Sequence, residues 1–98
     1  MKHRFLAPAR AELEEAVDLY EARRPGLGAE FATAVQMAIG RLLQLPLACP
    51  RISPRCRRCR VARFPYGVIY QVRPHHIVIV AVMHLRRDPS YWQDREEP

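Results

Sequence analysis

Acidic residues are missing from the middle of this sequence. No aspartate or glutamate stands between Glu30 and Asp88, yet the same stretch holds ten arginines. All ten acids of the chain lie in residues 12–30 or 88–97, so the net charge of +6 is strongly polarised along the sequence. A basic segment without counter-charges indicates a polyanionic partner, either nucleic acid or an acidic protein. A solvated, arginine-rich surface without function would have the same composition.

Long apolar runs are also absent, and Lys2 is the only lysine. The longest hydrophobic run, residues 77–83, has seven residues, whereas a membrane helix needs about 18. The N-terminus has a basic start but no hydrophobic stretch of the signal-peptide kind. We therefore expect a cytoplasmic protein without a membrane partner. In a reducing compartment, its three cysteines are not expected to form a structural disulfide.

The length of 98 residues predicts a single domain, residues 1–98, with a thin core and no deep cleft. Apolar periodicity predicts two helices joined by a tight break, then three strands joined by short turns. Pro8 suits the first turn of the first helix, and Asp88 with Pro89 suits the start of a short last helix. The expected elements are a strand over residues 2–7, helices over 9–24 and about 27–45, a loop from 46 to about 56, strands over 58–64, 66–73 and 76–85, and the short C-terminal helix.

This order predicts an α+β fold: a strand, a helical hairpin on one sheet face, a three-stranded antiparallel meander and a short C-terminal helix. Residues 76–85 are apolar on both faces and should form a central strand. Gly40, in the middle of the second helix, is expected to allow a close approach of helix or sheet. The buried stripe of that helix is expected to consist of Phe31, Ala34, Val35, Ala38, Leu42 and Leu45.

Three segments together resemble one family. YEARRPGLGAEF at residues 20–31 resembles the join between the two helices of ParE-like toxins, and RFPYGVIYQV at residues 63–72 resembles their central hairpin. VMHLRRDPSYW at residues 82–92 resembles their C-terminal signature. The resemblance implies a RelE/ParE-family toxin of a bacterial type II toxin–antitoxin system, neutralised by a small antitoxin. ParE-type members inhibit DNA gyrase, whereas RelE-type members cut mRNA in the ribosomal decoding site.

Catalysis of the RelE type would need a base or orienting group for the ribose 2′-OH, cations for the phosphorane and an acid for the leaving oxygen. The candidates are His84, Arg63 and Tyr91, of which only His84 titrates near neutrality. Strand alternation predicts that His84 shares a face with Val78, Val80 and Val82. The alternatives are a structural histidine at a strand end and a Tyr91 that docks the last helix. RelE-type enzymes rely on lysines in the sheet, which this chain lacks, so ParE-like activity is favoured.

The arginines give a candidate binding surface, because their fork matches phosphate and carboxylate groups. Its expected partner is an antitoxin with an acidic, amphipathic segment. The target is DNA gyrase or, alternatively, the ribosome with mRNA, and a third possibility is a non-toxic binding module of the same fold. The candidate binding residues are Arg57, Arg58, Arg60, Arg63, Arg73, Arg86 and Arg87.

The family resemblance does not account for the motif Cys56-Arg57-Arg58-Cys59. With Cys49 it supplies three thiols, one fewer than the four ligands of a closed zinc site. We therefore expect neither a metal nor a cofactor. The flanking arginines predict a lowered thiol pKa and an oxidation-prone Cys56 or Cys59. The alternative is that all three are ordinary loop and strand cysteines.

Overall fold

A four-stranded sheet forms the centre of the computed structural model, which describes residues 1–97. The strand order is β1-β4-β3-β2, where β1 (Lys2–Phe5) is parallel to β4 (His76–His84). The strands β2 (Arg57–Arg60), β3 (Tyr66–Val72) and β4 form the expected antiparallel meander. The first strand lies at an edge, and β4 is central because it pairs with β1 and β3. The predicted α+β fold is thus confirmed.

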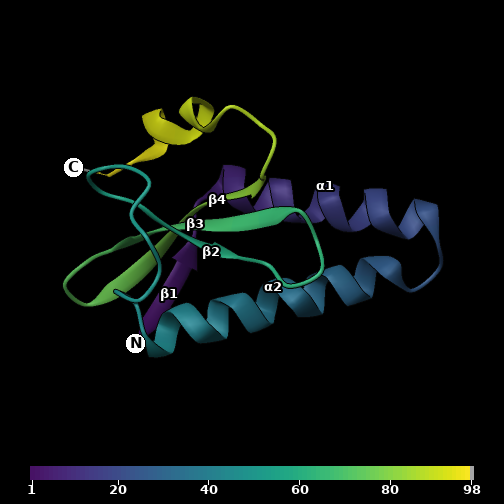
Figure 1. Ribbon diagram of the computed structural model, residues 1–98, viewed down its shortest axis with the longest axis horizontal. Coiled ribbons are helices and arrows are strands. Elements are labelled where there is room, and N and C mark those ends of the chain that lie inside the picture. Colours follow the sequence, from purple (N-terminus) through teal and green to yellow (C-terminus); the bar gives the residue numbers. More distant parts are fainter. Residues whose placement is uncertain (98) are drawn as a thin grey trace.

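The helices α1 (Ala7–Arg23) and α2 (Leu27–Gln44) form a hairpin that covers one face of the sheet (Figure 1). Gly26, the residue directly before α2, lies in the left-handed region with φ 90°, which glycine adopts without steric cost. The Glu21 carboxylate accepts the N–H groups of Gly26, at 2.9 Å, and Gly28, at 3.0 Å. The turn thus satisfies amide groups that a helix start leaves unpaired.

Gly28, rather than Gly40, is where the two helices come close. A Cβ at Gly28 would lie 2.6 Å from the carbonyl oxygen of Val17 in α1, whereas a Cβ at Gly40 would meet nothing within 4 Å. The expectation for Gly40 was therefore wrong. Periodicity places a glycine on a helix, but only the packing of the hairpin decides which glycine lies at the contact.

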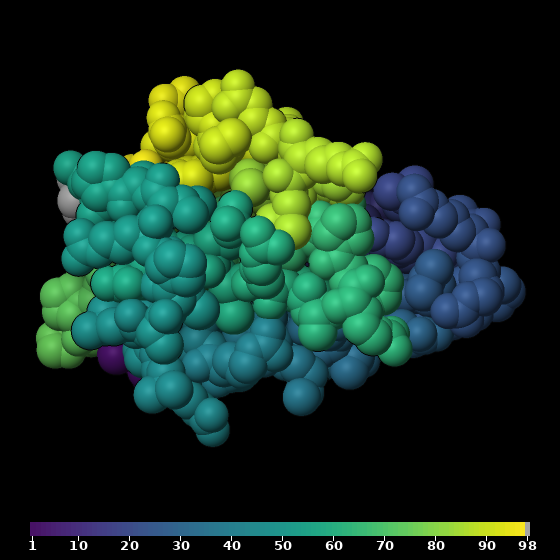
Figure 2. Space-filling model, in the orientation of Figure 1, coloured from purple at the N-terminus to yellow at the C-terminus, as the bar shows by residue number. Residues whose placement is uncertain are grey.

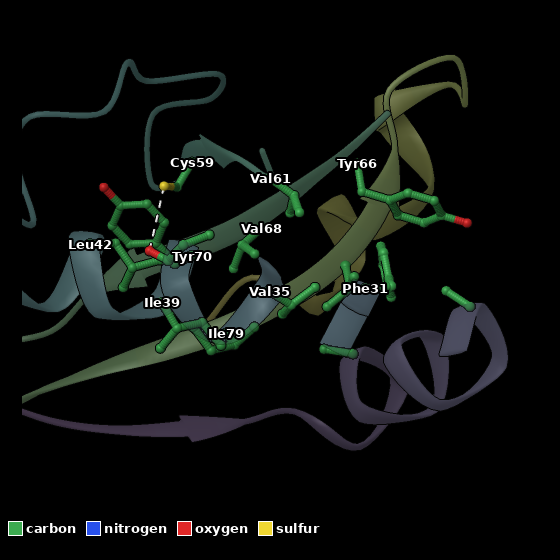
Figure 3. Close-up of a cluster of buried hydrophobic side chains, with 14 of the residues drawn as sticks. Phe31, Val35, Ile39, Leu42, Cys59, Val61, Tyr66, Val68, Tyr70 and Ile79 are labelled. Atoms are coloured by element: carbon green, nitrogen blue, oxygen red, sulfur yellow. Dashed lines mark hydrogen bonds between the residues drawn. The ribbon is translucent and has the colours of Figure 1, made fainter. Parts of the chain in front are cut away.

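The main core fills the space between the hairpin and the sheet (Figure 3). Phe31, Val35 and Leu42 of α2 are almost fully buried against Val68 and Tyr70 of β3. Leu45, predicted to belong to this stripe, is 66% exposed because α2 ends at Gln44 and the chain turns away. Ile39 is buried there in addition to the predicted residues.

A second, smaller core lies on the opposite face of the sheet. Trp92 of the 3-10 helix η1 (Pro89–Arg95) is fully buried there, and its Nε1–H donates to Met83 Sδ at 3.3 Å. Asp88 caps η1 by accepting the Ser90 N–H at 2.9 Å, as predicted. In Figure 1, η1 and α2 lie on opposite sides of the sheet. The sheet is therefore covered on both faces.

One irregularity in β4 changes which side chains face the hairpin. Ile69 pairs with Ala81 and Tyr70 pairs with Ile79, so Val80 is the extra residue of a β-bulge. Val80 and Ala81 both belong to the second core, and Val82 consequently belongs to the main core. The prediction that His84 shares a face with Val78 and Val80 was wrong, because a bulge shifts the alternation by one residue.

The strand predicted over residues 58–64 is shorter than expected. β2 ends at Arg60, and Arg63 has φ 70°, which is incompatible with a strand. The N–H of Val61 donates to the Tyr66 carbonyl at 2.9 Å and closes the turn that follows. The basic side chain at position 63 therefore projects from a turn instead of a sheet face.

An ion pair binds backbone groups at the edge of β4 where β1 has ended. Glu12 of α1 accepts the Val82 N–H at 3.2 Å and pairs with Arg95 of η1 at 2.8 Å. Arg95 also donates to the Val80 carbonyl at 3.2 Å. Glu12 and Arg95 thus bind backbone groups of β4 beyond the reach of β1, and they connect α1, β4 and η1.

Within residues 1–97, none of the helices combines the length and the apolar character needed to cross a membrane.

Candidate functional site at the basic end of the sheet

The topology sorts the candidate arginines into two groups. β2 ends, β3 begins and β4 ends at the same end of the sheet, because neighbouring strands are antiparallel. We call this the basic end, and Figure 2 shows its two segments, the turn after β2 in green and the chain after β4 in yellow-green, on one face of the molecule. Its candidate residues are Arg60, Arg63, His84, Arg86 and Arg87. Arg57 and Arg73 lie toward the opposite end, and Arg58 lies between the two groups, within β2 opposite Ile69.

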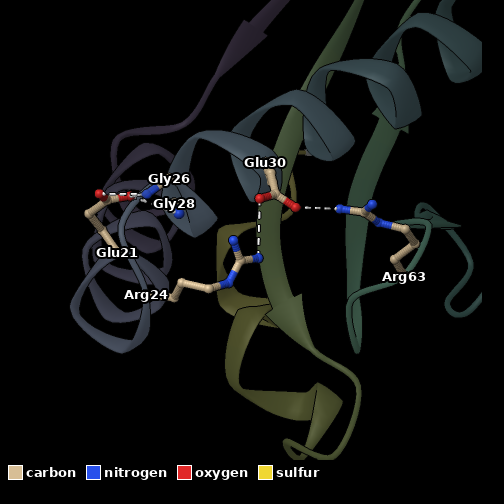
Figure 4. A network of polar contacts seen from close by, with 6 residues as sticks. All are labelled: Glu21, Arg24, Gly26, Gly28, Glu30 and Arg63. Atoms are coloured by element: carbon tan, nitrogen blue, oxygen red, sulfur yellow. Dashed lines mark hydrogen bonds and ion pairs between the residues drawn. The ribbon is translucent and has the colours of Figure 1, made fainter.

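Arg63 is held by an acid from the hairpin. Its Nη2 lies 3.0 Å from Glu30 Oε1, and Arg24 contacts the other carboxylate oxygen at 3.2 Å (Figure 4). The hydrogen bond from Arg63, followed by that from Arg24, lowers the pKa of Glu30. Glu30 is 33 residues from Arg63 in sequence, so the charge pattern alone gave no sign of this pair.

His84 and Tyr91 line a common hollow of about 160 Å³ between α1, the end of β4 and η1. The His84 ring packs edge-on against Tyr66, with centroids 5.2 Å apart, and its Nδ1 accepts the Arg86 N–H at 3.1 Å. The Arg87 guanidinium lies 3.6 Å from the centroid of the Tyr91 ring, which is a cation–π contact. The hollow thus joins an imidazole, a phenol and a guanidinium.

The phenol of Tyr91 does not ionise at neutral pH. Burial raises its pKa, and the nearby Glu12 carboxylate raises it further. The hydroxyl group therefore stays protonated and can serve only as a neutral donor or acceptor. Its ring also packs against the second core, which agrees with the docking role considered for Tyr91.

The three candidate catalytic residues are not all brought together. His84 and Tyr91 line one hollow, whereas Arg63 lines a different one and is paired with Glu30. The arginine that lines the His84 hollow is instead Arg87.

Two of the arginines on β2 have structural contacts. Arg57 Nη1 donates to the carbonyls of Leu47, at 3.1 Å, and Cys49, at 2.7 Å, and so holds the preceding loop. The aliphatic part of Arg58 covers Gly67, where an added Cβ would lie 2.9 Å from Arg58 Cγ. Arg60, Arg86 and Arg87 are exposed, while Arg73 is half-buried.

A second hollow, missed by the sequence analysis, runs along α2 beside the basic end. It has a volume of about 510 Å³, and Met37 in its lining is 63% exposed. An exposed methionine on the polar side of a helix was the available sequence signal. The hollow is lined by Ala29, Glu30, Thr33, Ala34, Met37, Arg41, Ala62 and Arg63.

The cysteine motif does not act as one unit. Cys56 belongs to the second core and Cys59 to the main core, on opposite faces of the sheet. Burial raises the pKa of Cys56 to about 12 and also raises that of Cys59. The prediction that flanking arginines lower these pKa values was wrong, because desolvation of the thiolate outweighs their attraction. All three cysteines are free thiols.

Comparison with known proteins identifies the class of protein that has this fold, the small α+β toxins of type II toxin–antitoxin systems. A family model described as the ParE toxin of the type II toxin–antitoxin system, parDE, matches residues 4–89. The chain belongs to this ParE toxin family, as its resemblance to ParE-like toxins predicted. Comparison with curated protein sequences gives no match.

A solved structure described as the chromosomal ParDE TA system from P. aeruginosa has the same fold. Its TM-score is 0.77 at 19% sequence identity, over 88% of this chain and 97% of that chain. At this identity the likeness concerns the fold, and the target of the toxin has to be argued from the residues.

Proposed function

We propose that this toxin inhibits growth by binding DNA gyrase in the cytoplasm, without catalysis of its own. The observation that carries the proposal is the separation of the catalytic candidates, since Arg63 is engaged by Glu30 away from the hollow of His84 and Tyr91. Cleavage of RNA needs cations placed around one phosphate. Exposed arginines at one end of a rigid sheet suit protein binding instead.

Membership of the ParE family implies a cognate antitoxin, and we propose that it neutralises the toxin by binding the hollow along α2. Alanines and Met37 give this hollow an apolar lining, and its two arginines, Arg41 and Arg63, supply positive charge that its one acid, Glu30, balances only in part. An amphipathic segment with acidic residues on its polar face would match both properties. Such a partner would bury several hundred Å² on each side.

The gyrase proposal is tested with purified full-length toxin, gyrase and relaxed plasmid. We expect loss of supercoiling in proportion to toxin concentration, and recovery when the antitoxin is added. A variant with Arg60→Glu and Arg86→Glu should inhibit less, whereas Lys2→Glu, at the opposite edge strand, should inhibit as the unmodified toxin does. Normal supercoiling at excess toxin would contradict the proposal.

Ribosome-dependent cleavage of mRNA is the second candidate, and the grouping of His84, Tyr91 and Arg87 in one hollow favours it. In this reaction His84 would orient the ribose hydroxyl and Arg87 would stabilise the charge on phosphorus. Programmed ribosomes should then yield cleaved mRNA, and His84→Ala should reduce the cleavage rate at least tenfold. Intact mRNA with the unmodified toxin would exclude it.

Expression of the chain alone separates both activities from a non-toxic binding module. Growth arrest that is relieved by co-expression of the antitoxin is expected for a toxin. Unchanged growth, with folded protein present in the cells, would favour the binding module.

A further inference from the structure

The segment before β2 continues the antiparallel pattern of the sheet for a few residues. Arg51 and Arg57 form an isolated antiparallel bridge. The Arg58 N–H donates to the Pro50 carbonyl at 3.1 Å, and the Ile52 N–H donates to the Cys56 carbonyl at 3.0 Å. These two hydrogen bonds flank the bridge, so Arg51 and Arg57 form a non-hydrogen-bonded pair.

Counting two residues outward from this pair places Cys49 opposite Cys59. The pairing alternates along an antiparallel ladder, so this position is again of the non-hydrogen-bonded kind, with Cα atoms expected about 4.5 Å apart. A disulfide spans Cα separations of about 4.4–6.8 Å. Extended by two residues, this register would place the two side chains on the same face at a distance that a disulfide can bridge.

Side-chain contacts agree with this register. Cys49 and Cys59 line the same hollow, of about 370 Å³, together with Arg41. The Arg41 Nη2 lies 3.9 Å from Cys59 Sγ, which also lies 3.6 Å from the Ala38 carbonyl oxygen (Figure 3) and 4.0 Å from that of Arg60. Cys49 also packs against the main core, to which Cys59 belongs. Burial raises the pKa of Cys59, and the nearby Cys49 thiol raises it further.

The two thiols differ in access to solvent. Cys49 is half-buried on the loop, whereas Cys59 is buried on β2. Cys49 is therefore the thiol that an oxidant reaches first, and Cys59 is placed to react with the oxidised sulfur. Cys56, on the opposite face of the sheet, has no access to either.

We propose that Cys49 and Cys59 are a redox-modification site that closes to an intramolecular disulfide when the protein meets a peroxide. The Cys49 thiolate attacks one oxygen of hydrogen peroxide, which breaks the O–O bond, forms a sulfenic acid and releases water after protonation. The Cys59 sulfur then attacks the sulfenic sulfur, forms the S–S bond and displaces a second water. Two thiols lose two electrons and two protons, and one peroxide is reduced to two waters.

The disulfide would link Cys49, in the loop before β2, covalently to Cys59 in β2, which is an edge strand of the sheet. It closes a short loop and removes conformational freedom from the unfolded chain. Oxidation should therefore raise the melting temperature by roughly 5–15 °C for a domain of this size. Neither the site nor this effect depends on whether gyrase is the target.

Three single variants of the full-length chain test the site, since each leaves one pair of thiols. In Cys56→Ala only Cys49 and Cys59 remain, and peroxide should remove two hydrogens from the intact mass of the monomer, reversibly with dithiothreitol. In Cys49→Ser the remaining pair is Cys56 and Cys59, and in Cys59→Ala it is Cys49 and Cys56. Neither should form an intramolecular disulfide under the same treatment.

Thiol counting and circular dichroism complete the experiment. The unmodified chain should keep one free thiol after oxidation, and each reduced variant should give the spectrum of the folded protein. Two unreacted thiols in Cys56→Ala, or covalent dimers in their place, would overturn the proposal. Formation of the disulfide in Cys49→Ser would overturn it too, because it would assign the reaction to Cys56 and Cys59.

Discussion

At the scale of single residues, the Glu12–Arg95 ion pair is expected to contribute to stability because both partners also bind backbone groups of β4. The Glu12 carboxylate satisfies a backbone N–H of β4 and a guanidinium that itself binds a β4 carbonyl. Both side chains are largely buried, with 14% and 20% exposure. A buried pair of this kind is costly to break on one side, since it leaves the other charge and the backbone groups unpaired.

We predict that Glu12→Ala lowers the free energy of unfolding by about 2 kcal/mol, because the Val82 N–H and Arg95 lose their acceptor. Glu12→Gln should cost less, since its amide oxygen can still accept a hydrogen bond. The matched control is Glu14→Ala in the same helix, where the side chain is exposed and a change below about 0.5 kcal/mol is expected. Urea unfolding measures all three, and equal losses for Glu12→Ala and Glu14→Ala would contradict the role given to the pair.

Glu30 provides a prediction about pH. Its pKa is lower in the folded protein than the ordinary value of 4.5, because of Arg63 and Arg24. Ionised Glu30 therefore stabilises the folded state above pH 4.5, and this contribution is lost as the pH falls through the lowered pKa. The stability difference between the unmodified chain and Glu30→Gln should shrink as the pH falls below 4.5. A difference that stays constant over this range would refute the ion pair, and Glu14→Gln serves as the exposed control.

At the scale of elements, α2 contains two glycines in opposite situations. Gly28 faces the Val17 carbonyl of α1, whereas Gly40 faces open space. Glycine is unfavourable in a helix interior, so its replacement by alanine stabilises the helix wherever there is room for the methyl group. The same substitution should therefore have opposite effects at the two positions.

We expect Gly40→Ala to stabilise the protein by about 0.5–1 kcal/mol, because it removes backbone freedom from the unfolded chain. Gly28→Ala should destabilise it by about 1–3 kcal/mol, because the new Cβ forces the hairpin apart. Thermal unfolding compares the two variants directly. A stabilising effect at both positions would show that α1 can move away from α2 without loss.

At the scale of the whole molecule, the positive charge concentrated in the middle of the sequence is only partly available on the surface, because several of the arginines bind groups within the protein. Arg63 meets Glu30, while Arg55 donates to the Glu97 backbone carbonyl and Arg57 donates to loop carbonyls. Arg60, Arg86 and Arg87 are exposed at the basic end, and Arg63 is exposed there too but is paired with Glu30. Partner binding should therefore depend on few charges and should be screened by salt.

We predict that Arg60→Glu with Arg86→Glu weakens the proposed complex with gyrase by roughly tenfold or more at low ionic strength, because charge reversal replaces attraction by repulsion. The loss should shrink at high ionic strength as the charges are screened. Lys2→Glu changes a charge at the other edge of the sheet and should have little effect. Titration calorimetry at two salt concentrations measures this, and an equal loss for Lys2→Glu would point to net charge instead of the basic end.

The sequence by itself determined the order and type of the elements, the central position of β4 and the family. Apolar periodicity, proline and glycine breaks and the Asp88 cap are local signals. They specify the same helices and strands in any fold that buries the same faces. The tertiary structure alone decided the face of His84, the partner of Arg63 and the neighbour of Cys59. A one-residue bulge at Val80, a contact across 33 residues and a short extension of the sheet before β2 produce these results. Such features arise when elements pack against one another, so no local pattern in the sequence could predict them.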